Sequence, residues 1–401
     1  MQGRALSTAH GLKLMFNAVD PVALTQALVR LDSVNPPGNE MACANLVGVV
    51  LADAGFDVQY SEMASDRACV VAVRRNSAHP QSCLAFTGHL DTVPLGAAPW
   101  TFDPFGGQIE GGRLYGRGTS DMKSGVAAMV VAALRCAPWL EQTAGLALVL
   151  TAGEETGCDG ARHLERVGGL PSRVGALIVG EPTANQPKLG HKGALWMHAC
   201  TSGRTAHGSM PEQGDNAIYK LARVVLALEK YPLGKGSDSV FGNPTLNVGT
   251  IAGGININSV PDRALVGIDI RTVPGLHHAD LEARLGRHLG RSVELRRLLD
   301  APGVYTDGGD AWVRGVCDLV AWAVPELAGA CKQPGVVPYF TDASVLKSAF
   351  GNVPTVILGP GEPHMAHQTD EYVSVSRIHE AAEIYEALIR QWCGRPDDAY
   401  S

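Results

Sequence analysis

The chain has 401 residues, of which 33 are Lys or Arg and 40 are Asp or Glu, giving a net charge of −7. This balance, together with the lack of any dense basic run, excludes a general nucleic-acid-binding protein. A chain of this length exceeds one ordinary hydrophobic core, so we expect two domains.

The cysteines and the apolar segments indicate the cellular setting. Nine scattered cysteines contain no Cys-x-x-Cys pair, a pattern typical of reduced thiols in a cytoplasmic protein. Residues 1–20 lack the apolar run of a signal peptide, and no later segment is apolar over the length needed to cross a membrane.

Helices and strands alternate over the first 185 residues. Residues 20–31 predict a helix with Asp20 as its N-cap and Pro21 as its first residue, and a second helix covers 41–55. Apolar strands and further helices follow: strands near Val58 and at 70–73, 83–87, 145–151 and 176–179, and helices that begin at Asp121 and near residue 160. This alternation predicts an α/β fold with a mostly parallel, helix-covered sheet.

The pattern changes between residues 186 and 297. Strands are predicted at 194–201, 245–251 and 264–271, and helices at 216–230 and 279–289. The low ratio of helices to strands predicts an inserted α+β domain. The α/β pattern then returns with a strand at 355–358 and a helix at 376–392, so the predicted catalytic domain is discontinuous, comprising residues 1–185 and 298–401.

Two adjacent carboxylates, Glu154 and Glu155, follow the predicted buried strand 145–151. Side chains alternate along an extended chain, so these two residues point in different directions, and one can bind a metal while the other faces water. Two like charges this close repel each other unless a cation holds at least one of them ionised. We therefore expect a cation at this strand end.

Other candidate ligands lie at or near strand ends and in adjacent loops, namely His89, Asp91, Asp121, Glu181 and His367. Ligands of open α/β sheets collect outside the carboxyl ends of the strands. Oxygen and imidazole ligands without cysteine suit zinc, manganese or cobalt. Asp91 could accept a hydrogen bond from the second ring nitrogen of His89 and so fix its tautomer.

Each candidate also has a structural interpretation when it is taken alone. His89 could be a structural histidine, Asp121 a helix N-cap, and the glutamates solvated acids at strand ends. His364 competes with His367, three residues away. The glycines at 116 and 118 resemble a dinucleotide loop, but Asp121 occupies the third glycine position and no Gly-Lys-Ser/Thr follows, which argues against phosphate binding.

Five motifs together resemble the M20 metallopeptidases and deacylases, a family that includes acetylornithine deacetylase, succinyl-diaminopimelate desuccinylase, aminoacylase-1 and glutamate-releasing carboxypeptidases. The motifs occur in the family's order at residues 88–94, 116–123, 153–155, 180–183 and 367–371. The inserted domain matches as well, at residues 191–193, 203–207 and 270–271.

The resemblance implies a site for two divalent metal ions. Asp121 would bridge both ions, His89 and Glu181 would complete one, and Glu155 and His367 the other. The His-x-x-Asp-Glu pattern selects His367 over His364. Three ligand carboxylates against two divalent ions leave one positive charge, which can hold a hydroxide. Zinc is the expected metal, and cobalt or manganese would accept the same ligands.

The remaining implied roles concern catalysis and the substrate. Glu154 would be the general base acting on water held between the ions, and Asp91 would orient His89. His207 would reach the active site of a partner subunit and help to bind the oxyanion, because the inserted domain is the family's usual dimerisation surface. Arg271 and Asn258 would hold the carboxylate end of the substrate, for which the planar guanidinium of arginine is suited.

These observations predict a cytoplasmic, homodimeric, two-metal amidohydrolase that cleaves a small N-acyl amino acid, of the deacetylase or desuccinylase type. Alternatives are a glutamate carboxypeptidase, a small-peptide exopeptidase, and a catabolic amidohydrolase or deaminase with an unusual substrate. A catalytically inactive binding or scaffold protein is the alternative of another class, which the intact Glu154 argues against. The sequence does not identify the acyl group, whose recognition we expect in segments 256–271, 302–310 and 341–344.

Overall fold

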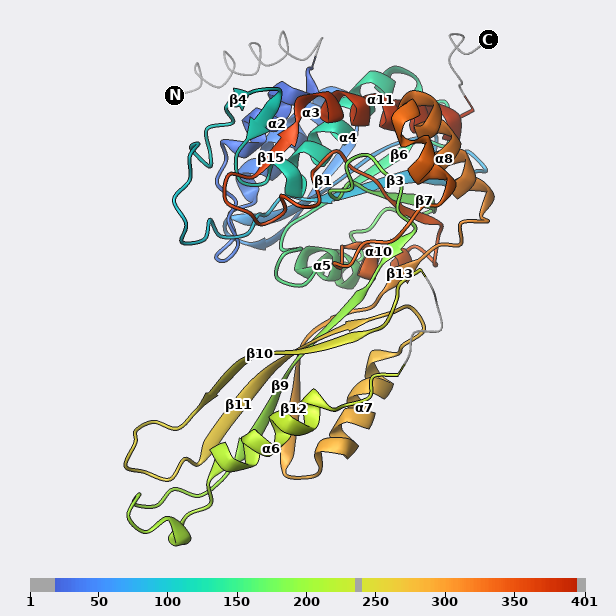
Figure 1. Ribbon diagram of the computed structural model, residues 1–401. Coiled ribbons are helices and arrows are strands. Elements are labelled where there is room, and N and C mark those ends of the chain that lie inside the picture. Colours follow the sequence, from blue (N-terminus) through green and yellow to red (C-terminus); the bar gives the residue numbers. More distant parts are fainter. Residues whose placement is uncertain (1–18, 235–239, 395–401) are drawn as a thin grey trace. The chain divides into compact units, whose positions relative to one another are not determined.

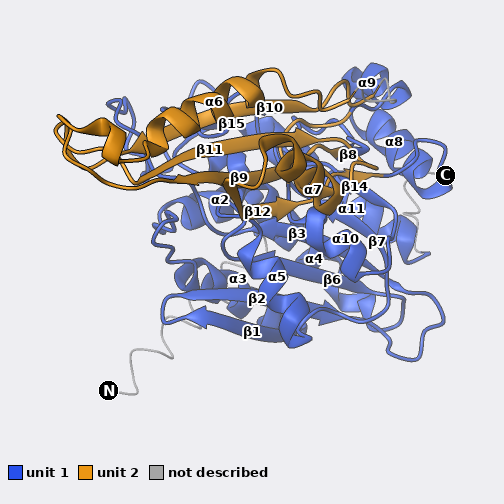
Figure 2. Ribbon diagram, turned by 90° about the horizontal axis from the view of Figure 1, so that it is seen from below, with its two compact units in different colours: residues 1–190, 306–335, 341–401 blue, residues 191–305, 336–340 orange. Residues whose placement is uncertain are grey.

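The structure is a computed structural model that describes residues 19–234 and 240–394. The N-terminal segment, where the sequence predicts no signal peptide, lies almost wholly outside the described residues. The chain divides into two compact units, drawn in two colours in Figure 2. The first unit comprises residues 1–190, 306–335 and 341–401, and the second comprises residues 191–305 and 336–340.

The first unit contains a six-stranded sheet (Figure 1). Its strands lie in the order β1 (Asp57–Ala64), β2 (Arg67–Arg74), β6 (Leu146–Thr151), β3 (Cys83–His89), β7 (Val174–Val179) and β14 (Thr355–Ile357). The last four run parallel, whereas β2 is antiparallel to both β1 and β6. The predicted mostly parallel sheet is therefore confirmed.

Helices cover both faces of this sheet, which explains why its central strands are apolar along their whole length. Every residue of β3 and β6 is buried. The longer helices are α2 (Pro21–Val29), α3 (Met41–Asp53), α4 (Ser124–Leu140), α5 (Asp159–Val167), α8 (Ala311–Ala323), α10 (Ala343–Ala349) and α11 (Val375–Trp392). Figure 1 shows α4 and α11 on one side of the sheet and α5 and α10 on the other.

The start of α2 is as predicted. The carboxylate of Asp20 accepts hydrogen bonds from the backbone N–H groups of Val22 at 3.3 Å and Ala23 at 3.1 Å, and Pro21 is the first helical residue.

Short elements complete the structure. The first unit also holds a three-stranded sheet of β15 (Tyr372–Ser374), β5 (Arg113–Tyr115) and β4 (Ile109–Glu110). Short strands β8 (Gly190–His191) and β13 (Val304–Tyr305) pair with each other. Single turns of helix lie at Pro211–Gln213 and Pro325–Leu327, and the last runs into α9 (Ala328–Lys332). Residues Thr119–Lys123 form a wider turn that contains non-helical dihedral angles.

The second unit is an antiparallel sheet with helices on one face. Its strands lie in the order β10 (Thr245–Gly253), β11 (Arg263–Thr272), β9 (Gly193–Ser202) and β12 (Val293–Ala301). Alternate residues of β11 are buried and pack with α6 (Ala217–Glu229) and α7 (His278–Leu289) in one hydrophobic core. The predicted α+β layer is present, and it contains one further strand, β12, that the sequence did not predict.

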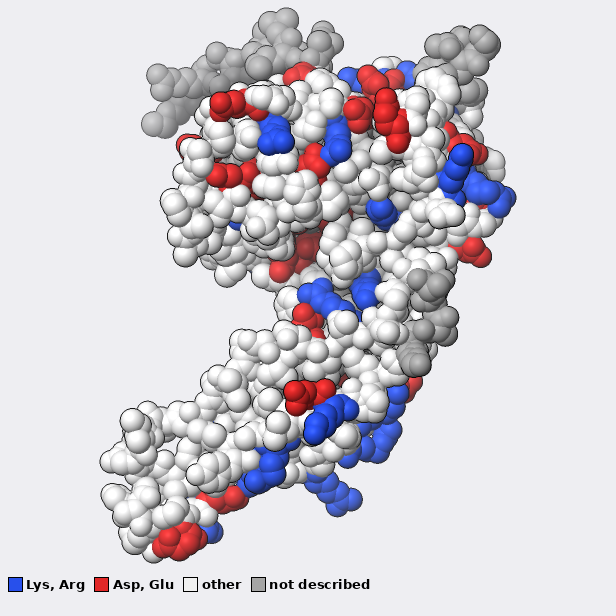
Figure 3. Space-filling view, in the orientation of Figure 1, with Lys and Arg blue, Asp and Glu red and all other residues white. Residues whose placement is uncertain are grey.

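None of the described helices is both long enough and apolar enough to cross a membrane. On the face of the molecule drawn in Figure 3, basic and acidic side chains are interspersed over both units. This agrees with the small net charge of the chain.

Candidate metal centre

The carboxyl ends of neighbouring parallel strands bring the predicted ligands together. His89 is the last residue of β3 and pairs in register with Thr151, the last residue of β6, three residues before Glu154. Glu181 follows the end of the adjacent strand β7 by two residues. Because these strands are parallel neighbours, their polar side chains meet at one edge of the sheet.

Two groups of candidate ligands share Asp121. In the first group the Nε2 atom of His89 lies 3.0 Å from Asp121 Oδ1 and 3.8 Å from Glu181 Oε1. In the second group the Nε2 atom of His367 lies 3.4 Å from Asp121 Oδ2 and 3.1 Å from Glu155 Oε2. The potential ligand atoms of each group all lie within 4.8 Å of one another. All five predicted ligands are therefore brought together, and His364 instead contacts Tyr372.

Asp121 differs from its predicted helical position. Helix α4 begins at Ser124, and Asp121 has φ −120° and ψ 93°, so it is not the N-cap. The backbone N–H groups of Ser120 and Asp121 donate to the carboxylate of Glu371. Gly118 has φ +83°, and a Cβ there would lie 2.5 Å from a methyl group of Thr92. The segment before α4 is thus a specific non-helical loop.

Asp91 contacts His89 differently from the expectation. The Nδ1 atom of His89 lies 2.9 Å from the backbone carbonyl oxygen of Asp91 and 3.6 Å from its carboxylate. A carbonyl oxygen requires Nδ1 to be the protonated nitrogen, which leaves Nε2 facing the ligand group. The carboxylate of Asp91 instead accepts the backbone N–H groups of Glu154 and Glu155, at 3.1 and 3.3 Å.

Glu154 belongs to neither ligand group and is 5% exposed. Its Oε1 atom has no hydrogen-bond partner among the described residues. Burial and then the charge of Glu181 raise the pKa of Glu154 well above its ordinary value. A buried carboxylate with an unpartnered oxygen is poised to accept a proton from a molecule that enters the site.

The ionisable groups of the site favour bound cations. Burial, followed by the charge of Asp121, raises the pKa values of Glu155 and Glu181. Burial alone would lower the pKa of His89, but its hydrogen bond with Asp121 and the nearby carboxylates raise it well above the ordinary value. Hydrogen bonds to Asp121 and Glu155 raise the pKa of His367 to about 10. In the metal-free site, bound protons therefore compensate the negative charge of the carboxylates. Divalent metal ions can supply the same positive charge, so these carboxylates and imidazoles fit such ions as ligands.

The three predicted residues of the inserted segment lie in the second unit. His207 is exposed and its Nδ1 atom lies 2.7 Å from Ser209 Oγ. Asn258 is also exposed, and its carbonyl accepts the N–H of Gly208 at 2.7 Å, which places it beside His207. Arg271 lies near the end of β11 and forms an ion pair with Asp269 at 3.0 Å.

Several residues around the site did not stand out in the sequence. Glu371 and Arg117 form a fully buried ion pair behind Asp121. Asn35 donates to the carboxylate of Asp91 at 2.9 Å, and buried Asp342 accepts from the hydroxyl of Thr151. Arg117 and Glu371 lie in the motifs at 116–123 and 367–371, and Asp342 lies in the segment 341–344, but only the folded chain shows their contacts.

The fold and these two ligand groups define a class of α/β protein whose site of carboxylates and imidazoles is suited to metal ions. The model of peptidase family M20/M25/M40 matches residues 85–391. The chain is 32% identical over 398 residues to succinyl-diaminopimelate desuccinylase of Rhodospirillum centenum, covering 94% of this chain and 98% of that one. It is 32% identical over 365 residues to acetylornithine deacetylase of Klebsiella pneumoniae, covering 87% and 90%.

Among solved structures, an M20 family metallo-carboxypeptidase from Sulfolobus solfataricus is similar, with a TM-score of 0.75 at 18% identity, covering 94% of this chain and 99% of that one. The chain therefore belongs to the M20 peptidase family.

Proposed function

We propose that this protein is a metal-dependent amidohydrolase that cleaves the amide bond of a small N-acyl amino acid. The observation that carries the proposal is the pair of ligand groups sharing Asp121, with the unpartnered, buried Glu154 beside them. The similarity to a desuccinylase and a deacetylase supports an acyl amino acid as substrate.

The ligand groups would each hold one divalent ion. His89 and Glu181 belong to one group, Glu155 and His367 to the other, and Asp121 to both. Zinc suits these ligands, and cobalt or manganese would also fit them. When bound, such ions polarise a carbonyl oxygen and make water a stronger acid.

Glu154 would carry the proton through the reaction. Its carboxylate takes a proton from the attacking water as the oxygen of that water bonds to the amide carbon. It then delivers the proton to the leaving nitrogen as the carbon–nitrogen bond breaks, so the products are a carboxylate and an amine. Asp91 would support both the metal site and the general base, since its carbonyl orients His89 and its carboxylate accepts the backbone N–H of Glu154.

The second unit would supply dimerisation and substrate contacts. Strand β10 is an edge strand, and Ile255 and Ile257 beyond it are 94% and 104% exposed, which supports an apolar interface with a second copy. In such a homodimer His207 would reach the partner's site and help to bind the oxyanion. Arg271 and Asn258 would bind the substrate carboxylate. None of the nine cysteines, all of which lie within the described residues, forms a disulfide, which supports the cytoplasm as the compartment.

A carboxypeptidase that acts on a small peptide is the second candidate, supported by the fold of the Sulfolobus metallo-carboxypeptidase. An N-acyl amino acid and a short peptide present the same amide and carboxylate to the site. The difference lies in the group on the amide carbonyl, which a substrate panel resolves.

The test is amine release from N-acetyl, N-succinyl and N-formyl amino acids, dipeptides and aryl-glutamates, by protein stripped of metal and reloaded with zinc, cobalt or manganese. We expect turnover of an acyl amino acid that Glu154→Gln reduces by about 10²- to 10⁴-fold. The variant should still bind two metal ions, because Glu154 lies outside both ligand groups.

Hydrolysis of dipeptides alone would favour the second candidate. Turnover that persists in Glu154→Gln would refute the role of Glu154. A protein that binds two metals but releases no amine from any substrate of the panel would contradict the proposed substrate class, and one that binds no metal would contradict the site itself.

A further inference from the structure

Glu371 is a fully buried carboxylate that accepts hydrogen bonds from four groups in one short segment. Its Oε1 atom accepts the backbone N–H groups of Ser120 and Asp121 at 2.8 and 3.0 Å. Its Oε2 atom accepts the N–H of Gly118 at 3.0 Å and Nη1 of Arg117 at 2.6 Å. Both oxygens therefore act as acceptors, and both are engaged by the segment that carries Asp121.

Arg117 links the same segment to the other side of the site. Its side chain is 1% exposed, and Nη1 also donates to the carbonyl of Gln368, the residue after His367, at 3.2 Å. Its Nη2 atom donates to the carbonyl of Pro94 at 3.2 Å, and its guanidinium lies 5.1 Å from the ring centroid of Trp100. One guanidinium thus contacts the loop after β3, the loop that carries His367, and Glu371.

We propose that the Glu371–Arg117 ion pair positions Asp121 and His367 for metal binding, an inference that rests on the proposed metal site. Asp121 has non-helical dihedral angles and is the ligand candidate shared by both groups. Glu371 holds the backbone of Asp121 through two neighbouring N–H groups, and Arg117 holds the chain one residue beyond His367. Rotation of either backbone would move a ligand of the second group away from Glu155.

Glutamine cannot replace this carboxylate without loss. Whichever way the new amide of the Glu371→Gln variant is turned, its NH₂ group faces backbone or guanidinium N–H donors where an oxygen accepts now. Two of the four hydrogen bonds would become repulsive contacts. Because these bonds hold ligand-bearing backbone, the variant should change the geometry and affinity of the metal site in addition to the stability of the fold.

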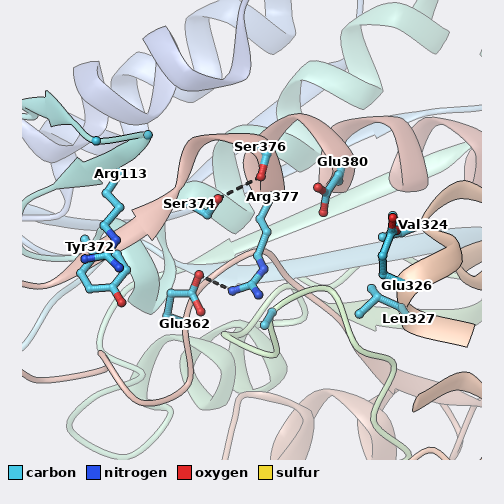
Figure 4. Close-up of a pocket in the computed structure, with 13 residues that line it drawn as sticks. Arg113, Val324, Glu326, Leu327, Glu362, Tyr372, Ser374, Ser376, Arg377 and Glu380 are labelled. Atoms are coloured by element: carbon cyan, nitrogen blue, oxygen red, sulfur yellow. Dashed lines mark hydrogen bonds and ion pairs between the residues drawn. The ribbon is translucent and has the colours of Figure 1, made fainter. Parts of the chain in front are cut away.

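A nearby ion pair offers a matched control. Glu362 is also a buried glutamate in the first unit, paired with Arg377 at the edge of a pocket of about 530 Å³ (Figure 4). Among the described residues its carboxylate has no hydrogen bond to the segment 116–121. The backbone N–H of Glu362 donates to Ser120 Oγ at 2.8 Å, but Glu362→Gln changes only the side chain. It therefore makes the same chemical change at a similar depth and leaves the hydrogen bonds of Glu371 to the segment 117–121 in place.

The experiment titrates metal-free protein with Co²⁺ and records the visible absorption spectrum, the number of ions bound and the dissociation constants. We expect Glu371→Gln to weaken cobalt binding by about 10- to 100-fold and to change the spectrum, while Glu362→Gln matches the wild-type protein. Arg117→Lys keeps the charge but loses the hydrogen bond to the carbonyl of Gln368, so it should weaken the binding of one of the two ions more than that of the other.

Wild-type affinity and spectrum in Glu371→Gln, with only a lower melting temperature, would overturn the proposal. If that variant does not fold, Arg117→Lys decides, and an unchanged spectrum in it would overturn the proposal equally. The proposal would also fail if Glu362→Gln perturbed the cobalt site as strongly as Glu371→Gln. Cobalt bound without amide hydrolysis would contradict the proposed function and leave this test intact.

Discussion

Asp342 is a buried carboxylate at the start of α10, in the segment 341–344 where the sequence predicts recognition of the acyl group. One of its oxygens accepts a hydrogen bond from the hydroxyl of Thr151, and the other has no hydrogen-bond partner among the described residues. Burial raises the pKa of Asp342 to about 6, against the opposing effect of the bond from Thr151. This residue should therefore make the stability of the metal-free protein depend on pH.

The direction of that dependence follows from the raised pKa. The folded protein holds a proton on Asp342 up to about pH 6, whereas the unfolded chain loses it near its ordinary value of 3.8. The stabilisation is therefore complete below pH 3.8 and is lost as the pH rises to about 6. We expect the free energy of unfolding of the wild type, relative to Asp342→Asn, to fall by up to about 3 kcal/mol across this window.

Urea unfolding of both metal-free proteins between about pH 4 and 8 would measure this difference. Thr151→Val is a useful companion, because it removes the hydrogen bond that lowers the pKa and should move the window to higher pH. Parallel stability curves for the wild type and Asp342→Asn would show that Asp342 does not titrate in this way.

At the scale of single residues, the sequence predicts groups that lie at recognisable strand ends. Glu154 and Glu155 follow an apolar run, and that position alone indicates where they lie in the fold. The pairing of Arg117 with Glu371 joins residues 254 apart in the chain, and no local pattern signals such a contact. The sequence predicted that the Asp91 carboxylate contacts His89, two residues away. The carboxylate instead accepts hydrogen bonds from the backbone of Glu154 and Glu155, which are more than 60 residues away and give no local signal.

At the scale of elements, two differences from the sequence prediction have local causes. The predicted helix at Asp121 begins instead at Ser124, because Glu371 binds the backbone that would form the first turn. Strand β12 (Val293–Ala301) was missed because most of its residues are polar or half-exposed, so it lacks the apolar alternation of β11. Continuous apolar strands bounded by polar residues or glycine, such as β3 and β6, were predicted nearly to their ends.

The close packing of α4 against the loop after β7 leads to a second prediction. A Cβ on Gly125 would lie 2.2 Å from the carbonyl oxygen of Gly180, the residue before Glu181. Gly125→Ala should therefore destabilise the protein by about 1–3 kcal/mol, although alanine is the better helix former. It should also weaken metal binding, since the helix would displace Glu181.

Chemical denaturation and metal titration of the variant would test this prediction. Gly286→Ala in α7 is the matched control, because the nearest atom to its Cβ would lie at an ordinary 3.7 Å. That substitution should be neutral or stabilise by up to about 1 kcal/mol. Equal effects of the two substitutions would show that the contact with Gly180 is not the cause.

At the scale of the whole molecule, the α/β fold with an inserted antiparallel layer follows from a change in strand and helix spacing that is visible in the sequence. The sequence does not predict that residues 336–340 belong to the second unit. This short segment lies beyond β12, and residues of the first unit precede and follow it in the chain. Its Phe340 packs with Trp196 of β9, a contact without a local signal.

The proposed homodimer predicts that two inactive variants restore activity when their subunits are exchanged. His207→Ala removes the residue that each subunit would lend to its partner, and Glu154→Gln removes the proton acceptor of its own site. In a mixed dimer the His207→Ala subunit keeps Glu154 and receives His207 from its neighbour, so one of the two sites is complete. Random exchange of equal amounts makes about half of the dimers mixed, which should restore about a quarter of the wild-type activity.

Exchange by dilution and reconcentration, followed by an activity assay and size measurement by light scattering, would check this. Ile257→Asp provides the control, because a charge on this fully exposed apolar side chain should disfavour the interface and prevent restoration. If His207 acted within its own subunit, the mixture would show only the sum of the two parent activities. If the protein stayed monomeric at all concentrations and kept full turnover, both the dimer interface and the role of His207 in the partner's site would be contradicted.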